Sequence, residues 1–149
     1  MAWNHSTVKV EDEKKSAKKY HAWHGLVAGL IVVAAAGAKV YLCLFSASWC
    51  PPCRAEMPRI AKTYAETLKA DPDIELIHFS CDRDEGKAMA WAKEHDVQFL
   101  VVKPKGGNPL DLRTRGIPHL FIVKADGSLV EEGHPMKLFT EQKLSEVKQ

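Results

Sequence analysis

Several features are scarce in this sequence, and each scarcity excludes a class of protein. Cysteine occurs only four times in 149 residues, whereas domains built on a disulfide framework pack many cysteines into a short chain. Neither sign of charge dominates, because 21 basic side chains are balanced by 19 acidic ones. The chain therefore lacks the electrostatic footprint of a nucleic-acid-binding protein. It also has no internal repeat, no low-complexity linker and no nicotinamide or flavin fingerprint, so we expect no cofactor. A monomer is expected as well.

Long hydrophobic runs are missing as well. The longest apolar stretch, Leu26–Ala36, is too short for a transmembrane helix. Its large residues recur near helical spacing and a glycine follows, which favours a buried helix before the first strand. The AAAGA that ends the stretch resembles a signal-peptide cleavage site, but more than twenty residues with an acidic cluster precede it. We predict a polar arm over 1–22 and a single domain over 23–149.

The remaining pattern predicts alternating strands and helices. The predicted elements are a strand over Lys39–Phe45, a helix over 50–68, a strand over Ile74–Ser80, a helix over 84–96, an extended run over Val97–Val102, a helical turn over 110–115, a hairpin over 119–133 and a helix over 139–148 with Thr140 as its N-cap. A strand–helix–strand unit gives parallel strands with a right-handed crossover. The hairpin adds antiparallel strands, so we predict an α/β fold with a mixed sheet, helices on both faces and an extra N-terminal helix.

Two cysteines, Cys50 and Cys53, lie where the first of these strands passes into a helix. Pro51 and Pro52 suit the first helical turn, where a missing N–H costs little. A sulfur at a helix N-terminus meets free backbone N–H groups and the positive end of the helix dipole, and both favour the thiolate. We predict that Cys50, the more exposed sulfur, attacks a partner disulfide and that Cys53, one turn further on, resolves the mixed disulfide.

Three other interpretations of the pair compete. A structural disulfide would close so small a ring that it would remove little entropy from the unfolded chain. A zinc site needs four ligands, but Cys43 and Cys81 stand alone inside strand patterns and no second closely spaced pair exists, so we expect no metal. The third interpretation is a pair without redox function, which a strand-to-helix junction disfavours.

The stretch FSASWCPPCRAEMP resembles the active-site segment of the thioredoxin superfamily. The likeness is to the nucleoredoxin and tryparedoxin branch, which carries W-C-P-P-C, and to thioredoxin-like reductases of the TlpA and ResA type. It continues through IELIHFSCDRDE and GIPHLFIVKADG, and it covers roughly 39–133. This resemblance implies a thioredoxin fold and thiol–disulfide exchange, but it does not specify a substrate.

Carried over residue by residue, the resemblance makes Cys50 the nucleophile and Cys53 the resolving cysteine. It makes Pro118 a cis-proline that faces the disulfide, and it pairs the backbone of Ile117 with the substrate chain. Trp49 is implied to be a flat contact surface, although simple core packing is the alternative. The substrate-binding residues implied in this way are Trp49, Pro51, Ile117 and Pro118.

Some positions depart from the family pattern. Leu44 stands where many thioredoxins have a buried aspartate that helps to deprotonate the resolving cysteine. Glu56 is a candidate to replace it as a tuning residue, and an exposed helix glutamate is the alternative. His119 follows the cis-proline position and could tune the thiolate or contact substrate, or be a partly buried polar group. Cys43 and Cys81 are expected to be inert core residues, with a regulatory role left open for Cys81.

We predict a protein-disulfide reductase that receives its electrons from another protein or a small thiol. An oxidase or isomerase using the same pair is an alternative, because the spacing of the cysteines does not set the reduction potential. A non-catalytic binding module with the same fold, which holds a partner or a metal, is another. The unpaired cysteines favour a reducing cytosol, and an exported protein, for example a periplasmic one, is the alternative.

Overall fold

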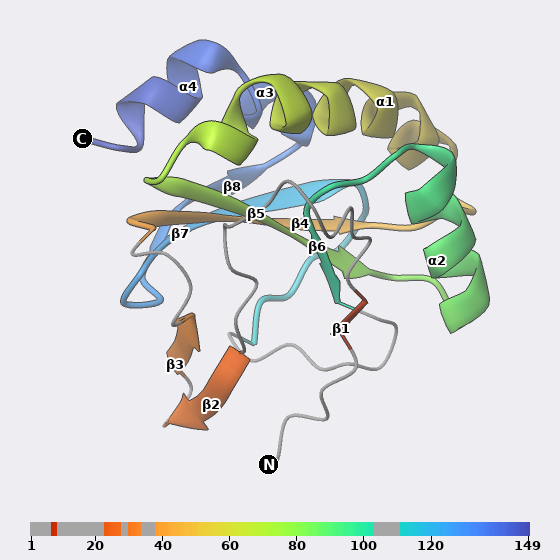
Figure 1. Cartoon of the computed structure of the whole chain (residues 1–149), viewed down its shortest axis with the longest axis horizontal. Helices are drawn as coiled ribbons and strands as arrows, with labels where there is room; N and C mark the ends of the chain where they lie inside the picture. The colour runs from red at the N-terminus through yellow and green to blue at the C-terminus, as the bar shows by residue number, and fades with distance from the viewer. Residues whose placement is uncertain (1–6, 9–22, 28–29, 34–37, 103–110) are drawn as a thin grey trace.

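The computed structural model describes residues 7–8, 23–27, 30–33, 38–102 and 111–149. A six-stranded sheet with the order β1-β6-β5-β4-β7-β8 forms its centre, and helices lie against it (Figure 1). The strands are β1 (Thr7–Val8), β4 (Val40–Ser46), β5 (Ile74–Ser80), β6 (Leu100–Val102), β7 (His119–Lys124) and β8 (Leu129–Gly133), with β2 (Trp23–Val27) and β3 (Leu30–Val33) forming a separate pair. The helices are α1 (Pro51–Glu66), the 3-10 turn η1 (Leu68–Ala70), α2 (Glu85–Glu94), α3 (Pro135–Leu138) and α4 (Glu141–Glu146).

β4 is the central strand, and all seven of its residues are buried. It pairs in parallel with β5 and antiparallel with β7, so the predicted mixed sheet with a parallel strand–helix–strand unit is confirmed. A strand buried on both faces is apolar at successive positions, because neither face of its sheet meets water. This explains the uninterrupted apolar run that precedes the two cysteines.

One face of the sheet packs against the helices. The first hydrophobic cluster contains Leu42 and Leu44 of β4, Trp91 of α2 and Leu144 of α4. It also contains the buried face of α1, which includes Met57, Ile60, Ala61 and Tyr64. The buried face of α2 consists of Ala88, Trp91 and Ala92. The crossovers from β4 to β5 and from β5 to β6 proceed in the same direction across the sheet. Because each is right-handed, both place their helix on the same face.

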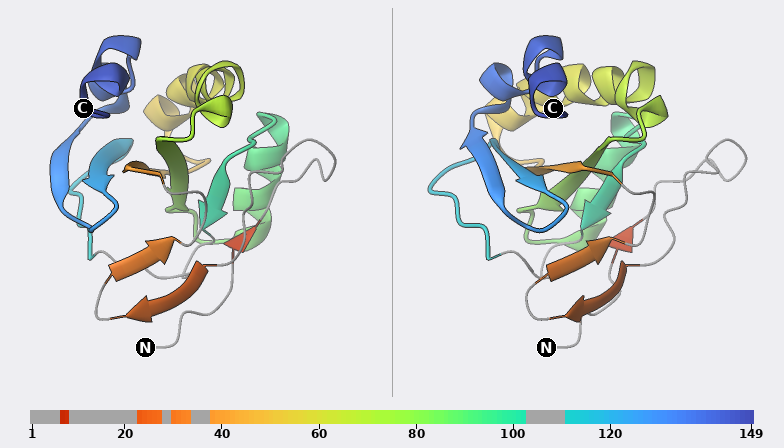
Figure 2. Two further views of the ribbon diagram at one scale, coloured as in Figure 1. Left: turned by 60° about the vertical axis from the view of Figure 1, so that its left-hand side comes forward. Right: turned by 90° about the vertical axis from the view of Figure 1, so that its left-hand side faces the viewer.

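The other face carries a second hydrophobic cluster. It joins alternate residues of the strands, including Tyr41, Cys43, Phe45 and Phe121, and it contains no helical residue in the described part of the chain. Helices flank the sheet as predicted, but the described ones contribute their core residues to the first cluster only. The β2–β3 hairpin lies on the side of the sheet away from α1 (Figure 2).

The predicted N-terminal helix is wrong in its described part. Trp23–Val27 and Leu30–Val33 are antiparallel strands. Helical spacing within a short apolar run does not distinguish a helix from a strand, and the β-branched run Ile31–Val33 favours the strand. Within the predicted polar arm, Thr7–Val8 forms the edge strand β1, which pairs antiparallel with β6. The other residues of both segments lie outside the described part.

The C-terminal third follows the predicted order. β7 and β8 form the expected hairpin, and Gly127 occupies its turn with a φ of 86°, which glycine adopts freely. The Thr140 side chain caps α4 as predicted, whereas the short helix α3 was not predicted. The helical turn predicted over 110–115 is wrong in its described part, because 111–115 are not helical and Asp111 has a φ of 49°. No described helix is both long enough and apolar enough to span a bilayer.

Candidate active site

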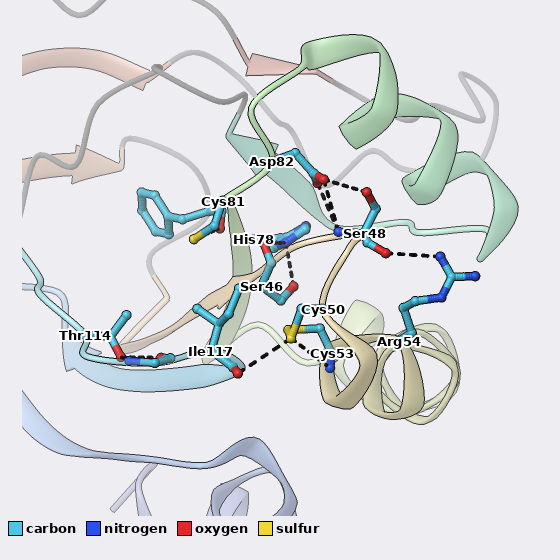
Figure 3. Close-up of a disulfide and its surroundings, with 12 residues drawn as sticks. Ser46, Ser48, Cys50, Cys53, Arg54, His78, Cys81, Asp82, Thr114 and Ile117 are labelled. Atoms are coloured by element: carbon cyan, nitrogen blue, oxygen red, sulfur yellow. Dashed lines mark hydrogen bonds between the residues drawn. A yellow bond between two sulfur atoms is a disulfide. The ribbon is translucent and has the colours of Figure 1, made fainter.

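The site begins with a disulfide at the N-terminus of α1. Cys50 is the N-cap residue, and Pro51 and Pro52 open the helix without requiring an N–H partner. Cys50 and Cys53 are joined by a disulfide with their Cα atoms 5.2 Å apart, and the backbone N–H of Cys53 donates to Cys50 Sγ over 3.3 Å (Figure 3). The sulfur thus occupies the place of a capping oxygen and meets one of the free N–H groups of the helix.

The backbone of Ile117 lies beside this disulfide, although it is 67 positions away from Cys50 in the sequence. The Ile117–Pro118 peptide bond is cis, in agreement with the implied cis-proline. The Ile117 carbonyl oxygen lies 3.6 Å from Cys50 Sγ (Figure 3). A disulfide sulfur carries no proton, so this is a close approach in the oxidised protein, and the thiol of reduced Cys50 could donate there. The structure therefore brings the implied nucleophile to the implied substrate-pairing backbone.

Exposure separates the members of the site. Trp49 is 63% exposed, which rules out core packing for this side chain and leaves a flat aromatic surface next to Cys50. Pro51 is also exposed. Cys50 is 3% and Cys53 1% exposed. Both cysteines are therefore buried in the oxidised protein, and the prediction that the Cys50 sulfur is the more exposed one stays a prediction.

Glu56 does not join the cysteines. Its carboxylate accepts two hydrogen bonds from Arg59, at 2.6 and 3.2 Å. The same guanidinium donates to the carbonyl oxygens of Phe139 and Pro135, at 2.7 and 3.2 Å. Glu56 therefore orients an arginine that ties α1 to the C-terminal segment, and no hydrogen bond links it to Cys50 or Cys53.

His119 also points elsewhere. Its ring centroid lies 4.7 Å from that of Phe121, a member of the second cluster, whereas the disulfide belongs to the first. Because alternate residues of a strand share a face, His119 lies on the face of β7 away from α1. Its Nε2 lies 3.4 Å from a Glu132 oxygen. The geometry supports no contact with the sulfurs.

The remaining cysteines and Leu44 behave as core residues. Leu44 is buried in the first cluster, so no carboxylate occupies that position beneath α1. Cys43 is buried without a disulfide partner, and this burial raises its thiol pKa to about 12. Cys81 is half-buried. Its pKa is raised mainly by this burial and to a lesser extent by the negative charge of Asp82.

Four polar residues near the site were not predicted to have a role. Ser46 Oγ lies 2.7 Å from His78 Nε2, and Ser48 donates to Asp82 from its backbone and its hydroxyl. Burial lowers the pKa of His78 to about 4, against opposing contributions from the Ser46 backbone and Asp82. His78 and Asp82 lie in the segment IELIHFSCDRDE, which contributed to the sequence-based prediction only through its resemblance to the family.

A metal centre finds no support in the described part of the chain. No group of three or more His, Cys, Asp or Glu side chains there could hold an ion. The site therefore contains a disulfide that can take part in redox exchange, a helix N-terminus, the exposed ring of Trp49 and the Ile117 carbonyl next to Cys50.

Comparisons with known proteins agree with this geometry. The chain is 34% identical over 88 residues to the thiol-disulfide oxidoreductase ResA of Oceanobacillus iheyensis, covering 58% of this chain and 45% of ResA. It is 33% identical over 116 residues to the thioredoxin-like protein YneN of Bacillus subtilis, covering 74% and 65% of the two chains. The chain thus spans about half to two thirds of these relatives.

Solved structures and family patterns lead to the same assignment. The thioredoxin of Wuchereria bancrofti superposes with a TM-score of 0.61 at 29% identity, covering 75% of this chain and 81% of that one. The sequence pattern described as Thioredoxin-like matches residues 37–129, more than half of the chain, including both cysteines and the cis-proline. On these grounds the chain belongs to the thioredoxin-like family.

Proposed function

We propose that this protein is a thiol–disulfide oxidoreductase that reduces protein disulfides through Cys50 and Cys53. The observation that carries the proposal is the position of the disulfide. It caps α1, where the Cys53 N–H reaches Cys50 Sγ over 3.3 Å, and it faces the Ile117 carbonyl at 3.6 Å. A sulfur in such a place is stabilised as a thiolate, which is the form that attacks disulfides.

The reaction takes two exchange steps. In the reduced protein, the Cys50 thiolate attacks one sulfur of the substrate disulfide, and the other substrate sulfur leaves as a thiolate that takes up a proton. The Cys53 thiolate then attacks Cys50 Sγ and releases the second substrate sulfur, which is also protonated. The substrate gains two electrons and two protons, and the protein is left with the Cys50–Cys53 disulfide.

Trp49, Pro51 and Ile117 are proposed to receive the substrate chain. Trp49 and Pro51 are exposed next to Cys50, and an aromatic ring provides apolar contact area that loses little conformational entropy on binding. Because the substrate must present an accessible disulfide to a nearly buried sulfur, we propose that it approaches as an extended protein segment along Ile117.

The reductase direction rests on the family resemblance alone. The relatives named thiol-disulfide oxidoreductase, of which ResA is one, support the exchange chemistry without giving its direction. The electrons come from another protein or a small thiol. A reducing cytosol is the proposed compartment, and export is the alternative. Equilibration of the pair with glutathione tests the direction, since a potential near roughly −120 mV, typical of a dedicated oxidant, would contradict it.

Turnover distinguishes this proposal from a binding module with the same fold. The wild-type protein is expected to accelerate the reduction of insulin by dithiothreitol, and Cys50→Ser to abolish that acceleration. Cys53→Ser is expected to accumulate mixed disulfides with protein substrates, which can be identified by mass spectrometry. Cys43→Ala serves as a control that removes a buried thiol without touching the pair. Acceleration that survives in Cys50→Ser would overturn the mechanism.

A further inference from the structure

Three polar or charged residues are buried in the described part of the chain, and all three lie at the same end of the sheet. They are Ser46, His78 and Asp82, with 1%, 1% and 4% exposure. Ser46 ends β4, and Asp82 follows the parallel strand β5, whose last residue pairs with Ser46. At these carboxyl ends of β4 and β5 the chain leaves the sheet and continues to Cys50 (Figure 3). Burying polar groups is costly unless they are hydrogen-bonded, so their partners are informative.

The partner of Asp82 is the loop that precedes Cys50. Both carboxylate oxygens of Asp82 lie 3.2 Å from the backbone nitrogen of Ser48, and the Ser48 hydroxyl donates to Oδ1 over 2.5 Å. The Ser80 hydroxyl donates to Oδ2 over 3.0 Å. Donors from the loop and from β5 thus satisfy a carboxylate that is almost entirely removed from water, and charge-assisted bonds of this kind are among the stronger ones.

Ser46 anchors the other end of the loop. Its carbonyl oxygen accepts from the Cys81 N–H over 2.8 Å, and its hydroxyl lies 2.7 Å from His78 Nε2. Between Ser46 and Cys50 only three residues remain, and the Cys50 N–H donates to the Ala47 carbonyl over 3.3 Å. The segment from Ser46 to Cys50 is therefore held at its start by β5 and in its middle by Asp82.

We infer that Asp82 is a positioning residue for Cys50, an inference that rests on the proposed function. By holding Ser48, Asp82 keeps Cys50 Sγ where it meets both the Cys53 N–H and the Ile117 carbonyl. Preorganisation of this kind matters because a small displacement of a reacting atom costs much of its reactivity. In Asp82→Asn one of the two acceptor oxygens becomes an NH2 group, which donates and cannot accept from Ser48 or Ser80. The loop is then held by a single neutral acceptor and is freer to shift.

The direction in which the Cys50 pKa changes when Asp82 is replaced distinguishes a positioning role of Asp82 from a purely electrostatic one. Removing a negative charge near Cys50 would by itself favour the thiolate and lower the thiol pKa. Losing the position at the helix N-terminus would raise it, because the Cys53 N–H no longer stabilises the anion. Arg54 also lies nearby and donates to the Ser48 carbonyl over 3.1 Å. At the end of β5, burial lowers the pKa of His78 to about 4, against an opposing contribution from Asp82, and burial and the Asp82 charge raise the pKa of Cys81.

The test is the pH dependence of Cys50 alkylation by iodoacetamide in the reduced protein, followed by peptide mass spectrometry. In Asp82→Asn the apparent pKa of Cys50 is expected to rise by about one pH unit, which lowers the thiolate fraction and the alkylation rate at pH 7 by up to about tenfold. Asp84→Asn is the matched control. It makes the same change two residues further on, where the carboxylate accepts from the Lys87 N–H and caps α2, and its Cys50 profile is expected to equal that of the wild type.

An unchanged or lowered Cys50 pKa in Asp82→Asn would overturn the inference. Should that variant fail to fold, Ser48→Ala removes the hydroxyl bond, leaves the carboxylate charge in place and is expected to raise the Cys50 pKa by a smaller amount. A normal profile in Ser48→Ala would then overturn it. The alkylation comparison needs no turnover, so it is independent of the insulin assay, whose failure would count against the proposed function alone.

Discussion

The backbone N–H of Cys53 lies 3.3 Å from the Sγ atom of Cys50 and donates to it. In the reduced protein the same N–H, together with the helix dipole, stabilises a Cys50 thiolate. We therefore expect Cys50 to titrate below the ordinary thiol pKa of about 8.5 and to be alkylated before the other three cysteines. Peptide-level alkylation between pH 6 and 9 measures this order. Cys43, whose pKa burial raises to about 12, provides the internal control, and its modification ahead of Cys50 would contradict the prediction.

Trp49 is predicted to act on substrate binding rather than on stability. Because the side chain is exposed, Trp49→Ala is expected to change the free energy of unfolding by no more than about 0.5 kcal/mol. Its loss should raise the KM for a protein disulfide about tenfold, since roughly 1.4 kcal/mol of contact with the substrate would disappear. Trp49→Phe, which keeps a flat ring, should recover part of the affinity. Trp91 is buried and serves as the comparison. Trp91→Ala is expected to lower the free energy of unfolding by about 3–5 kcal/mol. An unchanged KM in Trp49→Ala would remove this residue from the substrate surface.

His78 is predicted to make stability depend on pH. Its pKa is about 4 in the folded protein against 6.5 for an ordinary histidine, so the unfolded chain binds this proton more tightly. The free energy of unfolding should therefore fall as the pH drops from 6.5 towards 4, by about 3 kcal/mol from this residue, and level off below. Urea unfolding at a series of pH values measures the slope.

His78→Leu should flatten that slope, whatever its effect on stability at neutral pH. His134→Gln is the matched control, because His134 lies nearer the surface at the N-cap of α3. If the slope between pH 6.5 and 4 is the same in His78→Leu and in the wild type, another group is responsible for it.

Arg59 is predicted to hold the C-terminal segment onto α1. It donates to the carbonyl oxygens of Phe139 and Pro135 and to Glu56, so Arg59→Ala should destabilise the protein by about 2 kcal/mol, in the range of lost hydrogen bonds to a charged group. Lys62→Ala, which breaks an exposed ion pair with Glu66 on the same helix, should cost no more than about 0.5 kcal/mol. Chemical denaturation compares the two.

The same contacts bear on Glu56. Because Arg59 occupies its carboxylate, Glu56→Gln should affect stability more than the reduction potential of the cysteine pair. A shift of 30 mV or more in that potential, which corresponds to about 1.4 kcal/mol for a two-electron couple, would restore Glu56 as a tuning residue.

Local signals predicted the elements that depend on local chemistry. The Asp-Gly turn between β7 and β8, the Thr140 cap of α4 and the strand-to-helix junction at Cys50 were all placed correctly. Turn geometry, capping and helix starts are set by a few adjacent residues. The N-terminal segment failed because a short apolar run with β-branched residues fits either a helix or a strand, and pairing between strands decides the outcome.

In the candidate site, too, the features set by neighbouring residues were predicted, and those set by tertiary contacts were not. The pairing of Cys50 with Cys53 and the cis bond at Pro118 were predicted from residue types and from the family resemblance, and the structure contains both. The order in which the two cysteines act stays a prediction. Glu56 and His119 were chosen because they lie close in the sequence to the cysteines and to Pro118. Neither contacts the sulfurs. The Glu56 carboxylate is bound by Arg59, and the pleat of β7 places His119 on the opposite face of the sheet. Asp82 was missed for the converse reason, because its bond to Ser48 joins residues 34 positions apart.

By itself, the sequence determined a helix with a cysteine as its N-cap and a central strand with no polar face, because capping, proline geometry and hydrophobic patterning act over a few residues. Only the tertiary structure decided what surrounds that sulfur. The Ile117 carbonyl, the Ser48–Asp82 contact and the removal of His119 to the far face all depend on which strands lie side by side, and strand pairing is set by long-range packing that no short segment encodes.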